Sequence, residues 1–313
     1  MATPVILDCD PGHDDALAIM LAAADPAIDL KAITTVAGNQ TLEKTSLNAR
    51  RVCTLAGITG VPVAAGCDRP LAGALETAAD VHGESGLDGP ELGPPTVPLA
   101  GEHAVDLMHR ILRESPEPVT IIAVGPLTNV ATLLRRHPED ASRIRELVVM
   151  GGSIERGNHT PYAEFNVYVD PEAAAEVLAS GLPVTLHGLN VTHQALVTPD
   201  VVDRFRGLGT RLGEVCAELM TFFGGTYRRL WGFEAPPLHD PVAVAYVIDR
   251  SVVECVRAPV RVELEGAYTR GATVVDLHRR MGWEPNADVG ITLDRDRFWE
   301  LMIGAVERLG GRA

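Results

Sequence analysis

The stretch PVILDCDPGHDDALAIMLAAA, residues 4–24, joins a short apolar run to a longer Ala- and Leu-rich run. We expect a buried strand over Pro4–Cys9 and a helix over Asp14–Ala24, with a turn at Pro11 and Gly12 between them. In open α/β sheets, polar residues that directly follow a strand lie at the edge where ligands bind. This stretch therefore predicts a parallel α/β fold with a functional site beside residues 8–15.

The same alternation of short strands and longer amphipathic helices continues along the chain. Further strands are expected at Leu30–Ala37, Pro62–Ala65, Val119–Val124, Glu146–Met150 and Pro183–Leu186, with β-rich stretches at Val260–Leu264, Thr273–Leu277 and Val289–Leu293. Further helices are expected at Leu42–Ala56, Glu102–Arg113, Leu127–Arg136, Pro171–Ala179, Pro199–Phe205 and Arg211–Leu230, and from the N-cap Asp294 to Leu309. Near-continuous apolar strands that alternate with helices are typical of parallel sheets covered on both faces.

We therefore predict an α/β fold with a Rossmann-like, mostly parallel central sheet, helices on both faces and an active site at the carboxyl ends of the strands. The sequence shows no long linker, repeat or low-complexity segment, and Gly83–Pro98 is interpreted as a surface loop. Residues 1–313 are accordingly expected to form a single domain.

Composition narrows the class of partner. The 313 residues are 46% hydrophobic and 22% charged, which is typical of globular proteins. The net charge of −15 disfavours nucleic-acid and membrane partners. Five scattered cysteines without C-x-x-C spacing, and the lack of a signal-peptide pattern, favour a protein of the reducing cytoplasm.

The motif DCDPGHDD places four carboxylates, Asp8, Asp10, Asp14 and Asp15, within eight residues. Such crowding is unfavourable unless positive charge lies among them, and a helix N-terminus supplies only about half a charge. An oxygen-only ligand set suits a hard cation such as calcium or magnesium. The alternative is that Asp14 or Asp15 caps the helix and the other carboxylates are solvated.

Two further motifs carry polar groups suited to a small polar substrate. LHDP, residues 238–241, offers His239 as a proton donor near neutral pH, and Asp240 as a helix N-cap or a ligand. GNHTPYAEFNVYVDPEAA, residues 157–174, contains donors and acceptors that could bind vicinal hydroxyls, namely Asn158, Glu164 and Asn166; Asp170 is expected to cap the next helix. Asn39 in TTVAGN, His82 in the long loop and the turn AVGPLTN are weaker signals when taken alone.

Together, the segments DCDPGHDDALAI, TVAGN, HGESGLDG, VGPLTN, MGGS…GNHTPYAEFNVYVDPEAA and PLHDPVAVA stand in the order and spacing of one family. The chain resembles the inosine–uridine-preferring nucleoside hydrolases from Pro4 to about Phe298. The resemblance implies calcium-dependent hydrolysis of the N-glycosidic bond of purine or pyrimidine ribonucleosides, releasing ribose and free base. It also implies a homodimer or homotetramer.

The resemblance also implies roles for individual residues. One calcium ion per chain would be held by Asp10, Asp15, Asp240 and the main-chain carbonyl of Val124, and would bind the attacking water and the ribose 2′- and 3′-hydroxyls. Asp10 would be the general base and His239 the general acid. The remaining matches are ribose-binding or base-facing positions: Asp14, Asn39, Asn158, Glu164 and Asn166 for the ribose, and His82, Tyr227 and Trp231 for the base.

The base-facing positions depart from one subgroup. Phe223, Tyr227 and Trp231 lack the Gln that pyrimidine-preferring members use there, so the resemblance implies no strict uridine or cytidine preference.

General chemistry agrees with this assignment. Cleavage of an N-glycosidic bond passes through an oxocarbenium-like cation, which carboxylates stabilise. We expect His239 to keep a proton near pH 7, because carboxylates lie close to it.

Two alternative functions are also compatible with the sequence. A haloacid-dehalogenase-like phosphatase would use Asp8 as the phosphorylated residue and Asp10 as the acid/base. A non-catalytic nucleoside or sugar sensor would keep the pocket without the reaction.

Overall fold

The fold is built on one sheet of eight strands in a computed structural model that describes residues 2–311. The strand order is β3-β2-β1-β4-β5-β6-β10-β7, and of these strands only β7 runs antiparallel to its neighbour. The strands are β1 (Thr3–Cys9), β2 (Ile28–Thr35), β3 (Val63–Ala65), β4 (Val119–Ala123), β5 (Ile144–Met150), β6 (Val184–His187), β7 (Val253–Ala258) and β10 (Ala287–Leu293). The predicted α/β class with a mostly parallel sheet is confirmed.

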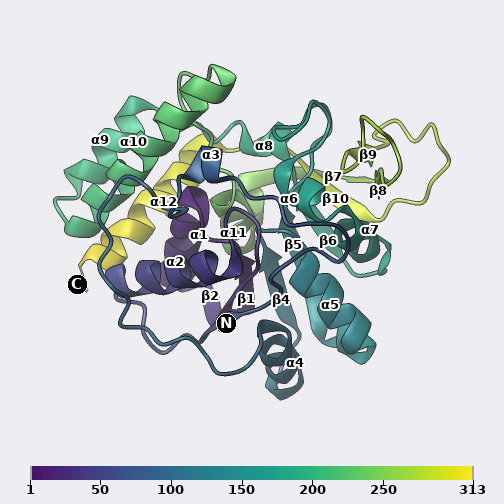
Figure 1. Ribbon diagram of the computed structural model, residues 1–313, viewed down its shortest axis with the longest axis horizontal. Helices are drawn as coiled ribbons and strands as arrows, with labels where there is room; N and C mark the ends of the chain where they lie inside the picture. The colour runs from purple at the N-terminus through teal and green to yellow at the C-terminus, as the bar shows by residue number, and fades with distance from the viewer. Residues whose placement is uncertain (1, 312–313) are drawn as a thin grey trace.

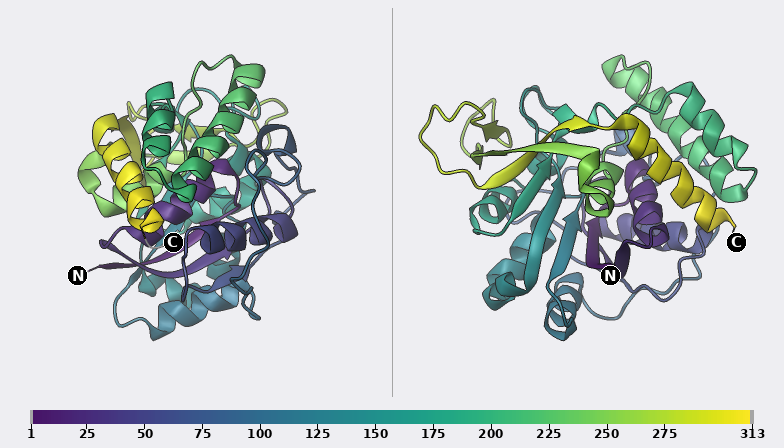
Figure 2. Two further views of the ribbon diagram at one scale, coloured as in Figure 1. Left: turned by 90° about the vertical axis from the view of Figure 1, so that its left-hand side faces the viewer. Right: turned by 180° about the vertical axis from the view of Figure 1, so that it is seen from behind.

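Helices cover both faces of this sheet (Figures 1 and 2). The helices longer than five residues are α1 (His13–Ala24), α2 (Leu42–Leu55), α4 (Ala104–Glu114), α5 (Thr128–Arg136), α7 (Pro171–Ala179), α9 (Pro199–Gly207), α10 (Arg211–Trp231), α11 (Pro241–Ile248) and α12 (Arg295–Gly310). Short helices are α3 (Ala79–His82), α6 (Phe165–Val169) and α8 (Leu189–Thr192), with 3-10 turns η1 (Pro138–Arg143) and η2 (Arg250–Val252).

The alternation of side chains along β1 explains the two hydrophobic cores. Val5 and Leu7 pack with residues of α1, α10, α11 and α12 on one face, while Ile6 packs with residues of α4, α5 and α7 on the other. Both sets of side chains are fully buried. A strand buried on both faces has no solvated side, which is why its sequence reads as an unbroken apolar run.

Most expected elements lie within two residues of their predicted bounds, but the carboxyl-terminal part differs. Strand β7 was not predicted, because several of its side chains, among them Glu254 and Arg257, are exposed at the edge of the sheet. Only Ala287–Leu293 of the β-rich stretch joins the main sheet; β8 (Val260–Val262) and β9 (Thr273–Val275) form a separate two-stranded sheet. This small sheet projects beside α7 at the right of Figure 1.

Two expected helix caps are observed. The side chain of Asp170 accepts a hydrogen bond from the Ala173 N–H at the start of α7, and Asp294 accepts one from Arg297 at the start of α12. Residues 83–98 carry no helix or strand, as expected, but His82 is the last residue of α3 and not part of the loop. Within residues 2–311, no helix has the length and apolarity that crossing a membrane requires.

Candidate active site

Three buried carboxylates meet where the chain leaves β1 and where α11 begins. Asp14, Asp15 and Asp240 each place one ligand oxygen so that all three atoms lie within 4.8 Å of one another. Asp240 occupies the N-cap position of α11 but makes no capping hydrogen bond with its side chain. Its carboxylate belongs to the cluster, although Asp240 lies 225 positions after Asp15 in the chain.

Asp10 lies against this cluster in a space that only glycine neighbours permit. Its Oδ2 accepts a 2.7 Å hydrogen bond from the Asn39 N–H, whereas its Oδ1 is buried without a hydrogen-bond partner. A Cβ atom on Gly38 or Gly125 would lie only 2.2 or 2.6 Å from an Asp10 carboxylate oxygen. The unpaired oxygen is what a site for a cation or a proton requires.

Asn39 and Asp15 organise the turn between β1 and α1. The Asp15 carboxylate accepts hydrogen bonds from the backbone N–H groups of Asp10 and Gly12, and the Asn39 amide donates to it at 3.2 Å. The capping alternative is thus correct in part, because Asp15 does cap α1. Capping does not account for Asp10, Asp14 and Asp240.

The electrostatics of the cluster favour a bound cation. Burial, reinforced by neighbouring carboxylates, raises the pKa of Asp14 to about 8 and the pKa values of Asp10 and Asp240 well above their usual range. Burial also raises the pKa of Asp15. A divalent cation reverses this trend, because it supplies the positive charge that the ionised carboxylates lack. Four buried carboxyl groups with oxygen donors fit calcium or magnesium.

The raised pKa of Asp14 should make the stability of the metal-free protein depend on pH. This raised pKa lets the folded, metal-free protein hold a proton that the unfolded chain releases, so the contribution of Asp14 to stability falls as pH rises from about 4 to about 8. The difference in unfolding temperature between chelator-treated wild type and an Asp14 variant should show this loss. Calcium at about 100 times its dissociation constant should raise the unfolding temperature near pH 8 by roughly 5 °C.

The matched variant for this experiment is Asp14→Asn, which removes a titrating group of the cluster. Between pH 4 and pH 8 it should lose less stability, or gain more, than the metal-free wild type, because the buried histidines act in the opposite direction in both proteins. The same change of unfolding temperature with pH in chelator-treated wild type and Asp14→Asn would contradict the raised pKa of Asp14.

The Val124 carbonyl, at the end of β4, is held by Asn166. Its oxygen accepts a 2.8 Å hydrogen bond from Asn166 Nδ2, which also donates to the Met150 carbonyl at 3.2 Å. Asn166 thereby joins the ends of β4 and β5. The sequence motif indicated a ribose ligand here, and this positioning role was missed because it depends on strand order.

Glu164 is the N-cap of the short helix α6. Its carboxylate accepts hydrogen bonds from the N–H groups of Gly152, Asn166 and Val167. Burial nevertheless raises the pKa of Glu164 to about 7. Asn158 closes the same loop, because its Oδ1 accepts from the Phe165 N–H, while its backbone carbonyl accepts from Trp231 Nε1 at 3.2 Å. These contacts were not predicted.

His239 forms the centre of a hydrogen-bonded series at the wall of the site. Its Nδ1 lies 2.7 Å from Thr192 Oγ1, and its Nε2 lies 2.7 Å from Tyr227 Oη. Burial lowers the pKa of His239 well below its usual range, so the expectation that it holds an extra proton near pH 7 is wrong. Desolvation of the imidazolium exceeds the attraction of the carboxylates. Burial also raises the pKa of the Tyr227 phenol, which stays protonated.

His82 is fixed by His13. The backbone N–H of His13 donates to His82 Nδ1 at 3.2 Å, so Nδ1 is an acceptor and the neutral ring carries its proton on Nε2. Burial lowers the pKa of His82 well below its usual range. The His13 ring stacks on His82 and Phe223, which ties α3 to α1 and α10.

The predicted residues meet around a cavity of about 300 Å³ at the carboxyl edge of the sheet. Its polar end is formed by the acidic cluster and the ends of the strands, and its other wall is aromatic. The predicted residues that line it are Asp14, Asn39, His82, Val124, Asn158, Glu164, Asn166, Tyr227, Trp231, His239 and Asp240. Asp10 and Asp15 lie against these residues through the hydrogen bonds of the turn. Phe165 and Phe223 also line the cavity.

Asp8 decides against the phosphatase alternative. It is fully buried, and its Oδ1 accepts hydrogen bonds from Thr34 Oγ1 at 2.7 Å and Asn129 Nδ2 at 2.8 Å. Its side-chain hydrogen bonds therefore join it to β2 and α5, and not to residues that line the cavity. A phosphoryl group could not reach it without disrupting the sheet, so Asp8 has a structural role that joins β1, β2 and α5.

Comparison with known proteins now decides the family. Residues 5–300 match the family model described as "Inosine-uridine preferring nucleoside hydrolase". The chain belongs to this family. It is a hydrolase of the N-glycosidic bond of ribonucleosides, and the predicted resemblance is confirmed.

Relatives and solved structures agree with this assignment. The nucleoside hydrolase is 50% identical over 303 residues to the pyrimidine-specific ribonucleoside hydrolase RihA of Escherichia coli (strain K12), covering 96% of this chain and 97% of the relative. A purine-preferring ribonucleoside hydrolase from Gardnerella vaginalis superposes with a TM-score of 0.92 at 31% identity, over 99% of this chain and 100% of that chain. A plant nucleoside hydrolase has a TM-score of 0.90 at 31% identity, covering 99% of each chain.

Proposed function

We propose that this nucleoside hydrolase is calcium-dependent and that Asp10, Asp15, Asp240 and the Val124 carbonyl hold one ion per chain. The observation that carries the proposal is the convergence of buried carboxylates at the polar end of the cavity, with Asp10 Oδ1 left unpaired. Oxygen donors of this kind suit a hard cation. When bound, calcium would orient the attacking water and the ribose hydroxyls and lower the pKa of the water.

Asp10 is proposed as the general base. Its Oδ2 is held by the Asn39 N–H, which fixes the carboxylate plane, and its Oδ1 is free to accept a proton from water. Transfer of that proton yields the hydroxide equivalent that attacks the anomeric carbon of the ribose.

Ribose binding is assigned to Asp14, Asn39, Asn158, Glu164 and Asn166. Asp14 and Glu164 are buried at the cavity, where their ionised forms stabilise the positive charge that develops on the sugar. Asn39 and Asn166 act in part by holding Asp10, Asp15 and Val124 in place. Buried groups that bind ribose hydroxyls also disfavour 2′-deoxyribose, because they would be left unpaired.

The Asn166 assignment predicts an effect on turnover. Asn166→Ala removes the bonds to the carbonyls of Val124 and Met150 and should lower kcat for inosine by roughly tenfold to a hundredfold, since misplaced groups lose transition-state alignment. Asn286→Ala is a matched control, because Asn286 also donates to two carbonyls but lies away from the cavity. A change confined to KM, and equal for 2′-deoxyinosine, would show that Asn166 only shapes a loop.

We assign binding of the departing base to the aromatic wall of the cavity. Phe223, Tyr227 and Trp231 follow one face of α10 at four-residue spacing, and the rings of Tyr227 and Trp231 lie 4.5 Å apart. His239 and Tyr227 are proposed to assist the leaving base together: neutral His239, with its proton on Nε2, donates to Tyr227 Oη, and the phenol proton passes to the base. The named specificity of the RihA relatives supports pyrimidine nucleosides as substrates, and the aromatic positions support purine nucleosides. We therefore propose that both inosine and uridine are hydrolysed.

The reaction class is tested by comparing two products. Reducing sugar should be released from inosine and uridine, whereas p-nitrophenyl phosphate should yield no phosphate. Failure to release either product, with ribose raising the thermal stability of the calcium-loaded protein, would support the non-catalytic sensor.

Compartment, domain organisation and assembly complete the proposal. We infer a cytoplasmic enzyme, supported by five cysteines that form no disulfide among the described residues. The sheet contains strands from both ends of the chain, which supports a single domain over residues 1–313.

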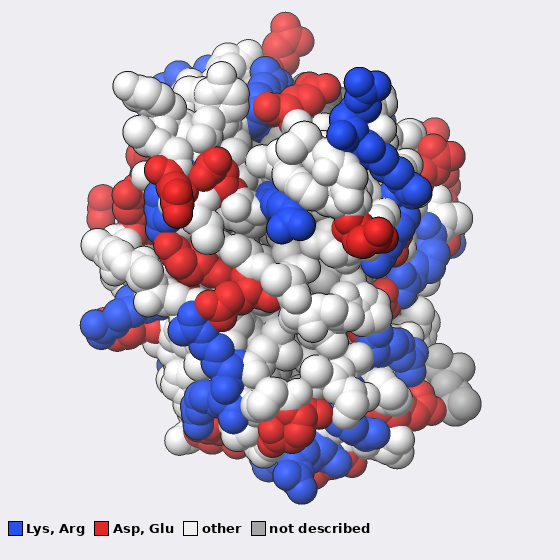
Figure 3. Space-filling model, turned by 90° about the vertical axis from the view of Figure 1, so that its right-hand side faces the viewer, with Lys and Arg blue, Asp and Glu red and all other residues white. Residues whose placement is uncertain are grey.

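On the face shown in Figure 3, basic and acidic side chains are interspersed, which favours a small-molecule substrate over nucleic acid. A homodimer or homotetramer is proposed from the family and is tested by light scattering.

A further inference from the structure

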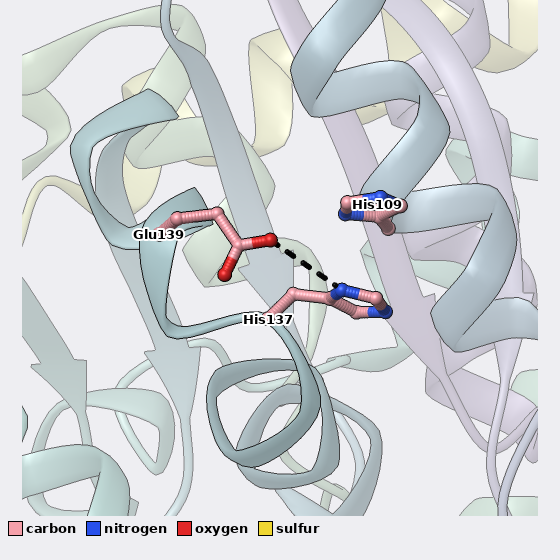
Figure 4. Close-up of side chains that lie close together, drawn as sticks. All are labelled: His109, His137 and Glu139. Atoms are coloured by element: carbon pink, nitrogen blue, oxygen red, sulfur yellow. Dashed lines mark ion pairs between the residues drawn. The ribbon is translucent and has the colours of Figure 1, made fainter.

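A cluster of metal-ligating side chains lies away from the cavity, where α4 packs against the connection from α5 to β5. His109 comes from the middle of α4, His137 directly follows α5, and Glu139 belongs to η1 (Figure 4). Each offers one ligand atom, and these three atoms lie within 4.8 Å of one another. Since His137 and Glu139 come from one short connection and His109 from a separate helix, an ion here would join the two segments.

A hydrogen bond prepares the His109 imidazole for coordination, and the His137 imidazole has a nitrogen without a hydrogen-bond partner. His109 Nδ1 lies 2.7 Å from Oδ2 of Asp140, which is almost fully buried. Because a carboxylate oxygen only accepts, Nδ1 carries the proton and Nε2 keeps its lone pair. Metal-binding histidines are oriented by carboxylates in this way. His137 Nε2 is buried without a hydrogen-bond partner, and its Nδ1 lies 3.7 Å from Glu139 Oε1.

We propose that His109, His137 and Glu139 form a binding site for a divalent transition-metal ion of the zinc class, separate from the acidic cluster of the active site. Two imidazoles and one carboxylate suit zinc, nickel or copper, whereas calcium prefers oxygen ligands only. Asp140 supports the site through His109 without being a ligand. The site therefore differs from the acidic cluster in both donor type and selectivity.

Metal capture requires a small rearrangement of the rings. The two imidazoles stack with centroids 3.7 Å apart and planes 17° apart, so the in-plane lone pairs run side by side. One of the two rings must turn before a nitrogen of His109 and a nitrogen of His137 can both face the same ion. The side chains of His109 and His137 are 24% and 22% exposed, and that of Glu139 is 59% exposed, which leaves room for this turn and a path from solvent.

The location predicts an effect on stability and not on the reaction. Residues 137–139 precede β5, whereas the cavity lies at the other end of that strand, beyond Met150. Seven residues at about 3.3 Å each place the cluster on the order of 20 Å from the cavity. An ion at the cluster would cross-link α4 to the α5–β5 connection, so it should stabilise the fold while leaving nucleoside hydrolysis unchanged.

The experiment is a zinc titration of the full-length protein kept saturated with calcium, followed by calorimetry. Wild type should bind about one zinc ion per chain at this site and unfold at a higher temperature with zinc. His137→Asn and Glu139→Gln should each weaken zinc binding by at least about tenfold, and Asp140→Asn by roughly tenfold to a hundredfold. His278→Asn, which removes an exposed histidine elsewhere, should bind zinc like wild type.

Inosine hydrolysis at the wild-type rate shows that each variant is folded. If His137→Asn does not fold, the zinc affinity of Glu139→Gln still tests the site. Cobalt provides a second readout, because its visible absorption should report nitrogen ligands in wild type and lose intensity in His137→Asn. Equal zinc affinity in wild type, His137→Asn and Glu139→Gln would overturn the proposal. It would then follow that these residues form a stacked and ion-paired surface contact only.

Discussion

Asp10→Ala is expected to lower the turnover of inosine by at least about a hundredfold, the loss typical of removing a general base. The substitution removes the one buried carboxylate oxygen of the cluster that has no hydrogen-bond partner, and it removes a proposed calcium ligand as well. Proton abstraction and metal binding should therefore fail together. Steady-state kinetics and metal analysis of the same preparation measure both effects.

Asp8→Ala is the matched control for this prediction. Asp8 lies two residues earlier and is equally buried, but its carboxylate bonds Thr34 and Asn129, whereas Asp10 lies against the acidic cluster. Its loss should mainly lower stability and disturb the turn after β1, while calcium binding is retained. A larger loss of turnover for Asp8→Ala than for Asp10→Ala would contradict the assignment and restore the phosphatase alternative.

The second large effect concerns the leaving base. His239→Ala should slow inosine hydrolysis by roughly a hundredfold or more, because a purine anion is a poor leaving group at neutral pH. The same variant should barely affect p-nitrophenyl riboside, whose phenolate leaves without a proton. Since Tyr227 Oη lies 2.7 Å from His239 Nε2 and the phenol carries the proton, Tyr227→Phe should show the same preference for the activated substrate, with a comparable loss.

The ratio of the two losses in kcat is the decisive quantity for His239. An equal loss for both substrates would mean that His239 positions the ribose or supports the fold. The proton donor would then be sought at His82, whose Nδ1 accepts from His13 and whose ring proton is therefore on Nε2. His82→Ala with both substrates is the corresponding measurement.

Local sequence pattern predicted the part of the fold that positions the site. The apolar run of β1, the turn at Pro11 and Gly12, and the Ala-rich α1 are specified by residues close together in the chain. Strand β7 was missed because several of its side chains are exposed at the edge of the sheet, so its sequence lacks the apolar run of a buried strand. The separation of β8 and β9 from the main sheet depends on long-range pairing, which short patterns do not encode.

In the site, as in the fold, the local features were predicted and the contacts between distant segments were not. The site residues were predicted from motifs after strands and from the family resemblance, and the structure brings them around one cavity. The hydrogen bonds among them were not predictable, because they join distant segments: Asn166 to Val124, Thr192 to His239, and His13 to His82. The neutral state of His239 was missed because its charge depends on burial, which the neighbouring residues in sequence do not reveal.

The most direct test of the calcium-dependent mechanism is a calcium titration of chelator-treated enzyme, with ribose release from inosine as the signal. Negligible release is expected without metal, and full activity after about one equivalent of calcium per chain. Full activity in the presence of chelator, or restoration by zinc but not by calcium, would contradict this mechanism.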